Sequence, residues 1–522
     1  MIDNLHEECG VAAVCRLSGK RAQTGRNKVL SGDNAAQLIP SLLLDLQNRG
    51  QLSCGISSYH PERDQILDTY KDIGVVADVF RLSNRAKAEA ILQEYAGQAA
   101  IGHTRYATCG RDDASYAQPF ERHHGRRWKW FAFAFNGQIA NVQELRQQLL
   151  KRDDYHIVRQ TDTEIIMHSL SFLLRGDKSP DLVDVFRNLS QQFDGCYNIV
   201  FLNGLGQLVV ARDPLGFRPL CYGVQGNVFA AASESVALAN TGFAGIKSLE
   251  PGTMILIDRG RMRLERFAEP RKPAHCFFEW VYFANAGSTI DSMGVYVARA
   301  NLGRALAKIE TEPIDPADCV VVPVPDTAKA AADALAHELG LPCVEGLLRN
   351  RYVGRTFIEG DNRQDRARRK YTPVPEVLEG KRVFLVEDSI VRATTLHVLA
   401  DQIKTRGRAR ELHLRVASPP ILGPCFYGID MSTVCELFAP HFLPRVHRGE
   451  LPEEFTKKMA RDVHADSLKY LPIKDLAECI GLPEDQLCLA CLNHCYPTPA
   501  GKRLYRKALR RARNNDHRRT YE

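Results

Sequence analysis

The chain has 522 residues, which is too long for one ordinary hydrophobic core, so at least two domains are expected. Apolar residues make up 44% of the sequence and charged residues 25%, as in soluble globular proteins. The first residues, Met-Ile-Asp-Asn-Leu-His-Glu-Glu, lack the basic start and apolar core of a secretory signal, and no apolar stretch reaches the length of a membrane span. We therefore expect a cytoplasmic protein with no membrane partner.

The net charge of +7 is concentrated at the C-terminus. Residues 501–522 contain nine Lys or Arg and two acidic residues, while the rest of the chain is neutral overall. A basic tail that follows a Pro-Thr-Pro-Ala-Gly break is most often a solvated helix or a frayed end. The charge is therefore not a signal for nucleic-acid binding, and we expect none.

Short apolar runs bounded by turn signals dominate the sequence up to about residue 265. Two helical patterns interrupt them, near residues 143–150 and 164–174. Many strands with few helices indicate packed sheets rather than a doubly wound domain. The apolar runs are residues 11–14, 101–103, 131–135, 199–201, 208–210 and 254–257.

The second half alternates helical stretches with apolar strands, which is the βαβ rhythm of a parallel sheet. A boundary near Ala268 to Pro273 is expected, because Glu-Pro-Arg-Lys-Pro forms neither element well. The expected helices are residues 295–309, 327–339 and 395–406, and the expected strands are 319–324, 383–386 and 412–416.

The most informative stretch is Val-Phe-Leu-Val-Glu-Asp-Ser-Ile-Val-Arg-Ala-Thr-Thr-Leu, residues 383–396. A buried strand ends at two carboxylates, Glu387 and Asp388, and a short hydroxyl-rich loop then enters a helix. Ligands bind at the carboxyl ends of parallel strands, and free N–H groups at a helix start bind phosphate. Carboxylates suit ribose hydroxyls and the Mg²⁺ carried by a pyrophosphate. The alternative is an acidic exit loop without a ligand.

This stretch resembles the phosphoribosyl-diphosphate loop of amidophosphoribosyltransferases, the glutamine-dependent enzymes that make phosphoribosylamine at the start of purine synthesis. Glu7-Glu8-Cys9-Gly10-Val11 resembles the family's cleaved leader and its nucleophilic cysteine, and matching segments recur to about residue 499. The resemblance implies an α+β N-terminal-nucleophile sandwich, a class II glutamine amidotransferase domain, followed by an α/β type I phosphoribosyltransferase domain. The implied segments are a removed leader at 1–8, a glutaminase domain at 9–268, a transferase domain at 269–475, and a cluster-binding segment with the basic tail at 476–522.

Cys9 is implied to be the glutaminase nucleophile. A cysteine at a chain terminus can use its own α-amine as the base, so this role requires removal of residues 1–8. Asn136 and Gly137 resemble the pair that binds the oxyanion, whereas Arg105 and Asp162 resemble the residues that bind the glutamine carboxylate and ammonium. The alternatives are a buried strand cysteine, a turn Asn-Gly, a strand arginine in a surface ion pair, and a capping box at Thr161 or Asp162.

The resemblance also implies a second site, which binds phosphoribosyl diphosphate at the loop that follows the strand at 383–386. The loop residues implied to bind this donor are Glu387, Asp388, Ser389, Ala393, Thr394 and Thr395. Thr327 joins Glu387 and Asp388 around Mg²⁺, and segments 350–356 and 366–370 resemble a mobile loop that closes over the pyrophosphate and carries Arg355.

Six positions depart from the usual family residues. The family commonly has Gly where this chain has Ala393, and glycine in a phosphate loop often takes a positive φ. Left-handed strain at Ala393 is expected to cost about 1 kcal/mol, roughly fivefold in donor affinity. The other departures are Asn48 for His, Leu52 for Glu, Tyr116 for Asn, Phe135 for His and Glu387 for Asp.

Fifteen cysteines in a cytoplasmic chain should be thiols or ligands rather than disulfides. By spacing alone, Cys488-Leu-Ala-Cys491 favours half of a zinc site or a redox pair. The resemblance instead implies a [4Fe–4S] cluster held by Cys276, Cys425, Cys488 and Cys491. No role is assigned to Cys495.

The expected reaction converts glutamine, phosphoribosyl diphosphate and water to phosphoribosylamine, glutamate and diphosphate, with ammonia passing internally between the sites. Purine nucleotides are expected as feedback inhibitors, and the chain as a homo-oligomer, a tetramer or dimer. Two alternatives stay open: a regulatory relative without catalysis, and a specialised transferase that uses the same donor.

Overall fold

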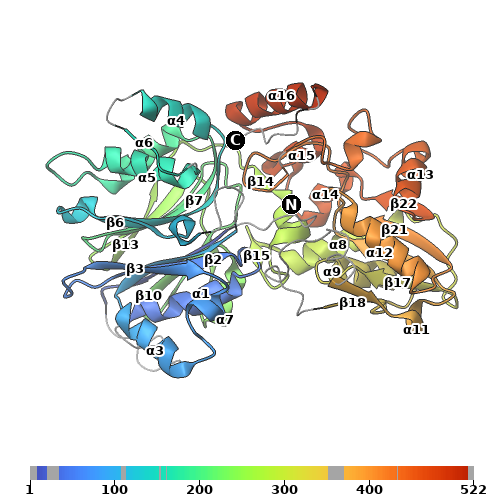
Figure 1. Ribbon diagram of the computed structural model, residues 1–522, viewed down its shortest axis with the longest axis horizontal. Helices are drawn as coiled ribbons and strands as arrows, with labels where there is room; N and C mark the ends of the chain where they lie inside the picture. The colour runs from blue at the N-terminus through green and yellow to red at the C-terminus, as the bar shows by residue number, and fades with distance from the viewer. Residues whose placement is uncertain are drawn as a thin grey trace.

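The computed structural model describes residues 9–19, 34–106, 113–151, 155–159, 161–350, 370–431, 433–514 and 516. Figure 1 shows the first half of the chain, blue to green, beside the second half, yellow to red. The expected boundary at 268–273 falls between β13 (Arg261–Arg266) and β14 (His275–Cys276). No helix within these ranges is both long and apolar enough to cross a bilayer.

The first half is a sandwich of two antiparallel sheets. One has the strand order β11-β9-β10-β1-β4-β2-β3 and the other β13-β12-β8-β7-β6-β5. The strands of the first sheet are β1 (Gly10–Arg16), β2 (Ser53–Tyr59), β3 (Leu67–Ile73), β4 (Ala99–Arg105), β9 (Cys221–Gln225), β10 (Val228–Ala232) and β11 (Lys247–Ser248). Those of the second are β5 (Phe120–Arg122), β6 (Phe131–Ile139), β7 (Gly195–Asn203), β8 (Leu208–Arg212), β12 (Thr253–Asp258) and β13.

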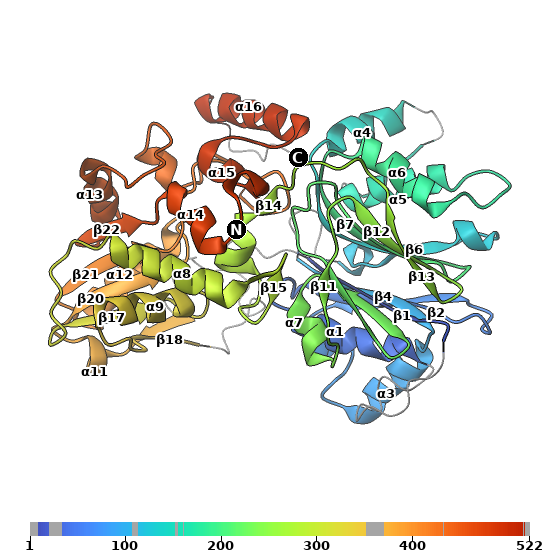
Figure 2. The same cartoon turned by 180° about the vertical axis from the view of Figure 1, so that it is seen from behind.

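Small side chains allow the two sheets to pack closely. Ala13, Ala132, Ala134 and Ala231 are fully buried in the layer between them. Helices cover both outer faces, so the order of layers is helix, sheet, sheet, helix (Figure 2). The outer helices include α1 (Ile39–Asp45), α3 (Arg85–Glu94) and α7 (Ser235–Asn240) on one face, and α4 (Val142–Leu150), α5 (Asp162–Leu173) and α6 (Leu182–Gln192) on the other. The predicted α+β sandwich is confirmed.

The second half contains a four-stranded parallel sheet in the order β17-β20-β21-β22. Its strands are β17 (Cys319–Pro323), β20 (Arg382–Glu387), β21 (Glu411–Val416) and β22 (Ser467–Tyr470). Both faces are buried: Phe384 and Val386 pack on one side, and Val383 and Leu385 on the other. Covering helices are α8 (Val295–Lys308), α9 (Lys329–Leu339), α12 (Thr394–Thr405), α13 (Glu453–Asp462) and α14 (Ile473–Ile480). The predicted α/β fold is confirmed.

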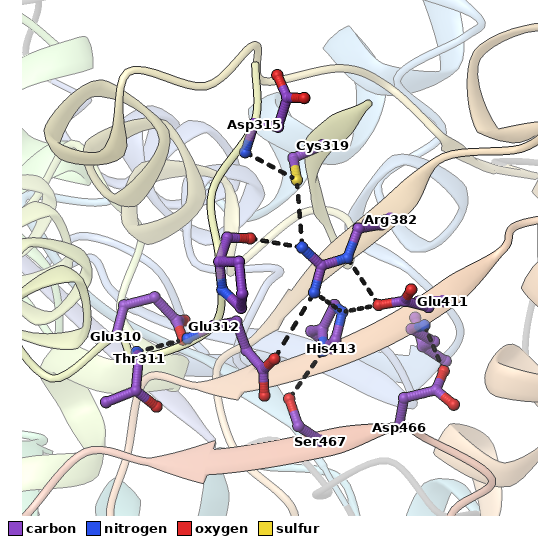
Figure 3. Close-up of polar contacts among 12 residues, drawn as sticks. Glu310, Thr311, Glu312, Asp315, Cys319, Arg382, Glu411, His413, Asp466 and Ser467 are labelled. Carbon is purple, nitrogen blue, oxygen red and sulfur yellow. Dashed lines mark hydrogen bonds and ion pairs between the residues drawn. The ribbon is translucent and has the colours of Figure 1, made fainter. Parts of the chain in front are cut away.

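An ionic cluster ties this sheet to the segment after α8 (Figure 3). The Arg382 guanidinium donates to Glu411 Oε2 at 2.6 Å and lies 3.6 Å from Glu312. His413 is bonded to Ser467 at 2.9 Å through Nδ1 and to Glu411 at 3.0 Å through Nε2. These contacts join β20, β21 and β22, so they fix the relative positions of the strands that carry the site.

The C-terminal segment lies across both halves. Its strand β23 (Leu487–Cys488) pairs with β14, and α15 (Ala490–Asn493) precedes α16 (Pro499–Arg513). In both views α16 lies close to α4, and Arg503 pairs with Glu144 of α4 at 2.7 Å. The basic tail is therefore helical over 499–513, and it is a docked helix with buried small residues rather than a fully solvated one.

Candidate active sites

Cys9 immediately precedes β1, at the edge where β4 ends. Its Sγ donates to the Tyr106 carbonyl at 3.6 Å, and the side chain is half-buried. Gly10 stands opposite Thr104 in the β1–β4 ladder. This register brings the predicted nucleophile next to Arg105, the predicted carboxylate ligand. Residues 1–8, the predicted leader, lie outside the described residues.

Asn136 and Gly137 lie inside strand β6, not in a turn. The Asn136 amide is buried, and its Nδ2 lies 3.5 Å from Ser233 Oγ. Gly137 has φ 146°, and a Cβ there would lie 2.1 Å from the Cys196 carbonyl oxygen, so only glycine fits. The ring of His103 in β4 is bonded to the Phe135 carbonyl at 3.1 Å, which holds the Arg105 strand against the Asn136 strand.

Asp162 is the first residue of α5, and Thr161 is its N-cap, since Thr161 Oγ1 accepts from Glu164 N at 3.3 Å. The capping interpretation is therefore correct for Thr161, and Asp162 is not the cap. Its Oδ2 accepts from the Ile139 N–H at 3.4 Å, two residues beyond Gly137. Burial raises the pKa of Asp162 to about 6, and backbone hydrogen bonds limit the rise.

Three departures from the family pattern surround this site. The Tyr116 ring lies between two guanidinium groups, 5.5 Å from Arg105 and 6.0 Å from Arg159. Phe135 buries its side chain in the core beneath the second sheet. Asn48 donates to Glu234 at 2.8 Å and to the Phe283 carbonyl at 3.1 Å. Each replacement is packed or hydrogen-bonded where it stands.

The second site lies at the carboxyl ends of β17 and β20. Asp388 accepts hydrogen bonds from the Thr327 hydroxyl and, at 2.6 Å, from the Ser389 hydroxyl. Burial and the charge of Asp388 raise the pKa of Glu387 well above its usual value. Burial also raises the pKa of Asp388, although the two hydroxyls oppose the rise. Two adjacent carboxyls, Asp388 buried and Glu387 partly buried, that resist ionisation together are suited to a bound cation.

Ala393 is the N-cap residue of α12, with φ 63° and ψ −5°. The predicted positive φ is confirmed. Thr394 and Thr395 form the start of the helix, where N–H groups are free of intrahelical partners. Arg355 and most of the predicted mobile loop, residues 351–369, lie outside the described residues. Within the described ranges, no group of three or more His, Cys, Asp or Glu side chains forms a single-ion site.

The four predicted cluster ligands line one cavity. Cys276 of β14 is the register partner of Cys488 of β23, and Cys425 and Cys491 complete the lining. All four side chains are buried thiols. Burial raises the pKa of Cys488 to about 12, and burial and the neighbouring thiols raise that of Cys491 well above its usual value. Cys495 is exposed.

A buried charge network joins the two halves next to this cavity. Arg49 pairs with Glu234 at 2.6 Å and with Glu279 at 2.7 Å. Arg218, which lines the cavity, lies 3.3 Å from Glu279. Sequence reasoning assigned no role to these residues, or to His103 and Ser233, because their partners are distant in the sequence.

Known proteins resemble the chain over nearly its whole length. A profile described as a glutamine amidotransferase domain matches residues 54–244. The amidophosphoribosyltransferase of Methanothermobacter thermautotrophicus is 40% identical over 503 residues, covering 95% of each protein. The chain belongs to the amidophosphoribosyltransferase family. The Bacillus subtilis member is 34% identical over 506 residues, again covering 95% of each.

Solved structures of the family share both domains in the same order. One is described as glutamine phosphoribosylpyrophosphate amidotransferase from B. subtilis complexed with ADP and GMP. It matches with a TM-score of 0.79 and 33% identity, and covers 94% of this chain and 98% of that chain. A second, described as the allosteric regulatory enzyme of purine biosynthesis, has a TM-score of 0.80 with 33% identity and covers 94% and 97%. The predicted order, a glutaminase fold followed by a phosphoribosyltransferase fold, is confirmed.

Proposed function

We propose that the protein is a glutamine-dependent amidophosphoribosyltransferase of the first committed step of de novo purine biosynthesis. It converts glutamine, phosphoribosyl diphosphate and water to 5-phosphoribosylamine, glutamate and diphosphate. The observation that carries this proposal is that one chain of this family holds residues proposed for both reactions: Cys9 next to Arg105 in the β1–β4 ladder, and Asp388 with Thr327 at the end of a parallel sheet. Similarity over both domains disfavours a regulatory relative.

In the glutaminase site, Cys9 Sγ attacks the amide carbon of glutamine. The carbon–nitrogen bond then breaks, ammonia leaves, and water hydrolyses the thioester to glutamate. The Asn136 amide and the Gly137 N–H bind the oxyanion, while Arg105 and Asp162 hold the substrate carboxylate and ammonium. The α-amine of Cys9 acts as the base, so residues 1–8 must be removed first. An active protein whose intact mass still includes them would exclude this base.

In the transferase site, ammonia that has passed internally attacks the C1 atom of the ribose. The bond from C1 to the diphosphate oxygen breaks, the diphosphate leaves with the electron pair, and the ammonium nitrogen loses a proton. Glu387 and Asp388 bind the ribose hydroxyls, and the N–H groups from Ser389 to Thr395 bind phosphate. Arg355 and its loop would close over the donor and exclude water, which competes with ammonia.

Magnesium fits Thr327, Glu387 and Asp388. All three offer oxygen, and the two carboxyls are adjacent at the end of β20, where burial raises the pKa of each. Thr327, Glu387 and Asp388 would hold the ion, and in the described part of the chain no group of three His, Cys, Asp or Glu side chains forms there. When bound, magnesium supplies positive charge to the leaving diphosphate.

A [4Fe–4S] cluster fits Cys276, Cys425, Cys488 and Cys491. Four thiols face one cavity, and Cys₄ is the usual ligand set of such a cluster. Within the described ranges these thiols do not form a single-ion site. Because burial raises the pKa of Cys488 and Cys491, these two thiols would lose their protons on binding iron. When bound, the cluster would supply four bonds that connect β14, the segment around Cys425 and the C-terminal segment.

Iron analysis tests the cluster directly. Protein prepared without oxygen should contain about four irons per chain. Cys488→Ser should lose iron and visible colour, whereas Cys495→Ser, a matched exposed thiol nearby, should keep both. Stoichiometric zinc without iron, or full iron in Cys488→Ser, would contradict this ligand set.

The remaining proposals concern partners and location. Purine nucleotides are proposed as feedback inhibitors, which is supported by the ADP and GMP in the B. subtilis complex. A cytoplasmic homo-oligomer is also proposed, either a tetramer or a dimer.

The overall proposal is tested with anaerobically purified protein. Glutamine, phosphoribosyl diphosphate and magnesium should give glutamate and diphosphate in equal amounts. Omission of glutamine with ammonium added should still give diphosphate. Release of glutamate without diphosphate would indicate a glutaminase without transferase activity. Release of neither product would indicate the regulatory relative without catalysis. A specialised transferase would require a further acceptor before diphosphate is released.

A further inference from the structure

Ser233 lies at the end of β10, fully buried between the nucleophile strand and the oxyanion strand. Its backbone N–H donates to the Val11 carbonyl at 3.0 Å, and its Oγ accepts from the Val11 N–H at 3.0 Å. Val11 is two residues from Cys9. Ser233 therefore fixes the strand that presents the nucleophile through both its backbone and its side chain.

The same hydroxyl faces the side-chain amide of Asn136, with 3.5 Å between Nδ2 and Oγ. That distance is long for a hydrogen bond donated by the amide. A serine hydroxyl that accepts one hydrogen bond still has its own proton to donate, and in the described part of the chain no other acceptor bonds to it. An amide can turn over without changing its shape, so Asn136 can present Oδ1 to this proton instead.

Asn198 favours the turned amide independently. It is the register partner of Asn136 across β6 and β7, so the two side chains share one face of the sheet. Asn198 Nδ2 donates to the Pro219 carbonyl at 2.8 Å, but its Oδ1 is buried and has no hydrogen-bond partner within the described ranges. With its Oδ1 toward Ser233, Asn136 would present Nδ2 as a donor on the face that it shares with Asn198, whose buried Oδ1 needs a donor.

We propose that Ser233 is a positioning residue of the glutaminase site. Its hydroxyl accepts from Val11 N–H and donates to Asn136 Oδ1, so that Asn136 Nδ2 donates to the oxyanion beside the Gly137 N–H. One oxygen atom thus sets the distance between the nucleophile strand and the oxyanion donor. This inference rests on the proposed glutaminase function.

The test compares Ser233→Ala, Ser233→Cys and Ser233→Thr with wild type. Loss of an oxyanion donor lowers kcat by about 10²–10³, so loss of the group that only orients it should lower kcat by about tenfold. KM for glutamine should change by less than about threefold, because Arg105 and Asp162 still bind the substrate. Ser233→Thr keeps the hydroxyl and should recover most of kcat. Ser233→Cys keeps the shape of the side chain but makes weaker hydrogen bonds, so its kcat should lie between those of Ser233→Ala and wild type. This variant keeps the test valid if Ser233→Ala does not fold.

Ammonia-dependent transfer supplies the internal control, since it bypasses the glutaminase site and should stay unchanged in every variant. Ser57→Ala is the matched control: this buried serine of β2 bonds to Thr69 at 2.7 Å, and the variant should keep wild-type kcat for glutamine. Wild-type kcat in Ser233→Ala or Ser233→Cys would overturn the inference, as would equal losses in kcat and ammonia-dependent transfer. A wild-type protein that hydrolyses no glutamine would instead overturn the proposed function.

Discussion

Replacing Ala393 by glycine tests the backbone of the proposed phosphate loop. Ala393 has φ 63° and ψ −5° at the start of α12, a region that glycine enters freely and alanine does not. Its carbonyl accepts from His397 N at 3.0 Å, so the strained residue is held by the helix that it begins. The folded chain therefore contains the strain, and glycine should relieve it there.

The size of the effect follows from three contributions. A left-handed conformation costs an L residue about 1–2 kcal/mol. Glycine gives back roughly 0.5–1 kcal/mol, because its unfolded chain has more conformational freedom. The Ala393 methyl is buried, and its loss removes at most about 0.8 kcal/mol. The strain is the largest of the three, and the net expectation is a rise of about 0.5 kcal/mol in the free energy of unfolding.

Urea unfolding of Ala393→Gly and wild type measures this difference. Ala400→Gly is the matched control, because Ala400 is a buried alanine inside the same helix. In a helix interior glycine costs about 1 kcal/mol relative to alanine, so this control should be destabilised. The expected result is a contrast in sign between two alanine-to-glycine changes seven positions apart in the chain.

Titration with phosphoribosyl diphosphate distinguishes where the strain acts. If the strain at Ala393 is already present in the folded chain without the donor, the donor affinities of Ala393→Gly and wild type should agree within about twofold. Equal destabilisation of both glycine variants would refute the argument. If Ala393→Gly bound the donor fivefold more tightly and had an unchanged free energy of unfolding, the loop would take the left-handed backbone only in the complex. The estimate of affinity made from the sequence assumes that case.

Three further predictions address the two sites and the core. Asp388→Asn should abolish diphosphate release while leaving glutamine hydrolysis measurable, since the carboxylate lies in the transferase domain; unchanged release would move the donor site away from β20. Because burial raises the pKa of Asp162 to about 6, glutamine should bind about tenfold more weakly per pH unit below 6, where the carboxylate is lost. KM values between pH 5 and 8 test this, and Asp162→Asn should bind weakly with no such dependence; a flat profile in wild type would argue against the ammonium contact. Burial lowers the pKa of His103 to about 3, so near pH 6.5 this histidine takes up a proton in the unfolded chain but not in the folded chain. The free energy of unfolding should therefore fall by about 2 kcal/mol between pH 8 and pH 5. His103→Gln should lose that part of the slope in urea unfolding, and an identical slope in both forms would show that the ring is protonated in the folded chain.

Strands β17 and β20 of the parallel sheet were predictable because they are continuous apolar runs, whereas β22 (Ser467–Tyr470), which alternates apolar and polar residues, was not predicted. Residues 383–386 are buried on both faces in β20, and such runs need no partner to be recognised. Strand β2, Ser53–Tyr59, was missed because three of its seven residues are serine, a residue with no preference for strands. Its burial depends on β3 and β4, which the local sequence does not specify.

The residues of the candidate site likewise divide into those that the sequence indicated and those that only the folded chain brings together. Asn136-Gly137 could be a turn by its local sequence, and only pairing with β7 makes it part of a strand. The motif residues were identified by resemblance. Ser233 lies 97 positions from Asn136 and 222 from Val11, so its contacts exist only in the folded chain. Long-range partners of this kind have no local signal.

The pairing of β14 with β23 has a consequence for synthesis of the protein. It closes a loop of about 210 residues, and bringing such ends together costs on the order of 5 kcal/mol in chain entropy. A ribosome makes Cys276 long before Cys488 and Cys491, so β14 of a nascent chain has no β23 to pair with beside the completed sandwich. A ligand that binds all four thiols is consequently bound only after Cys491 has left the ribosome, and a chain that ends before Cys488 has the glutaminase fold without the β14–β23 pairing.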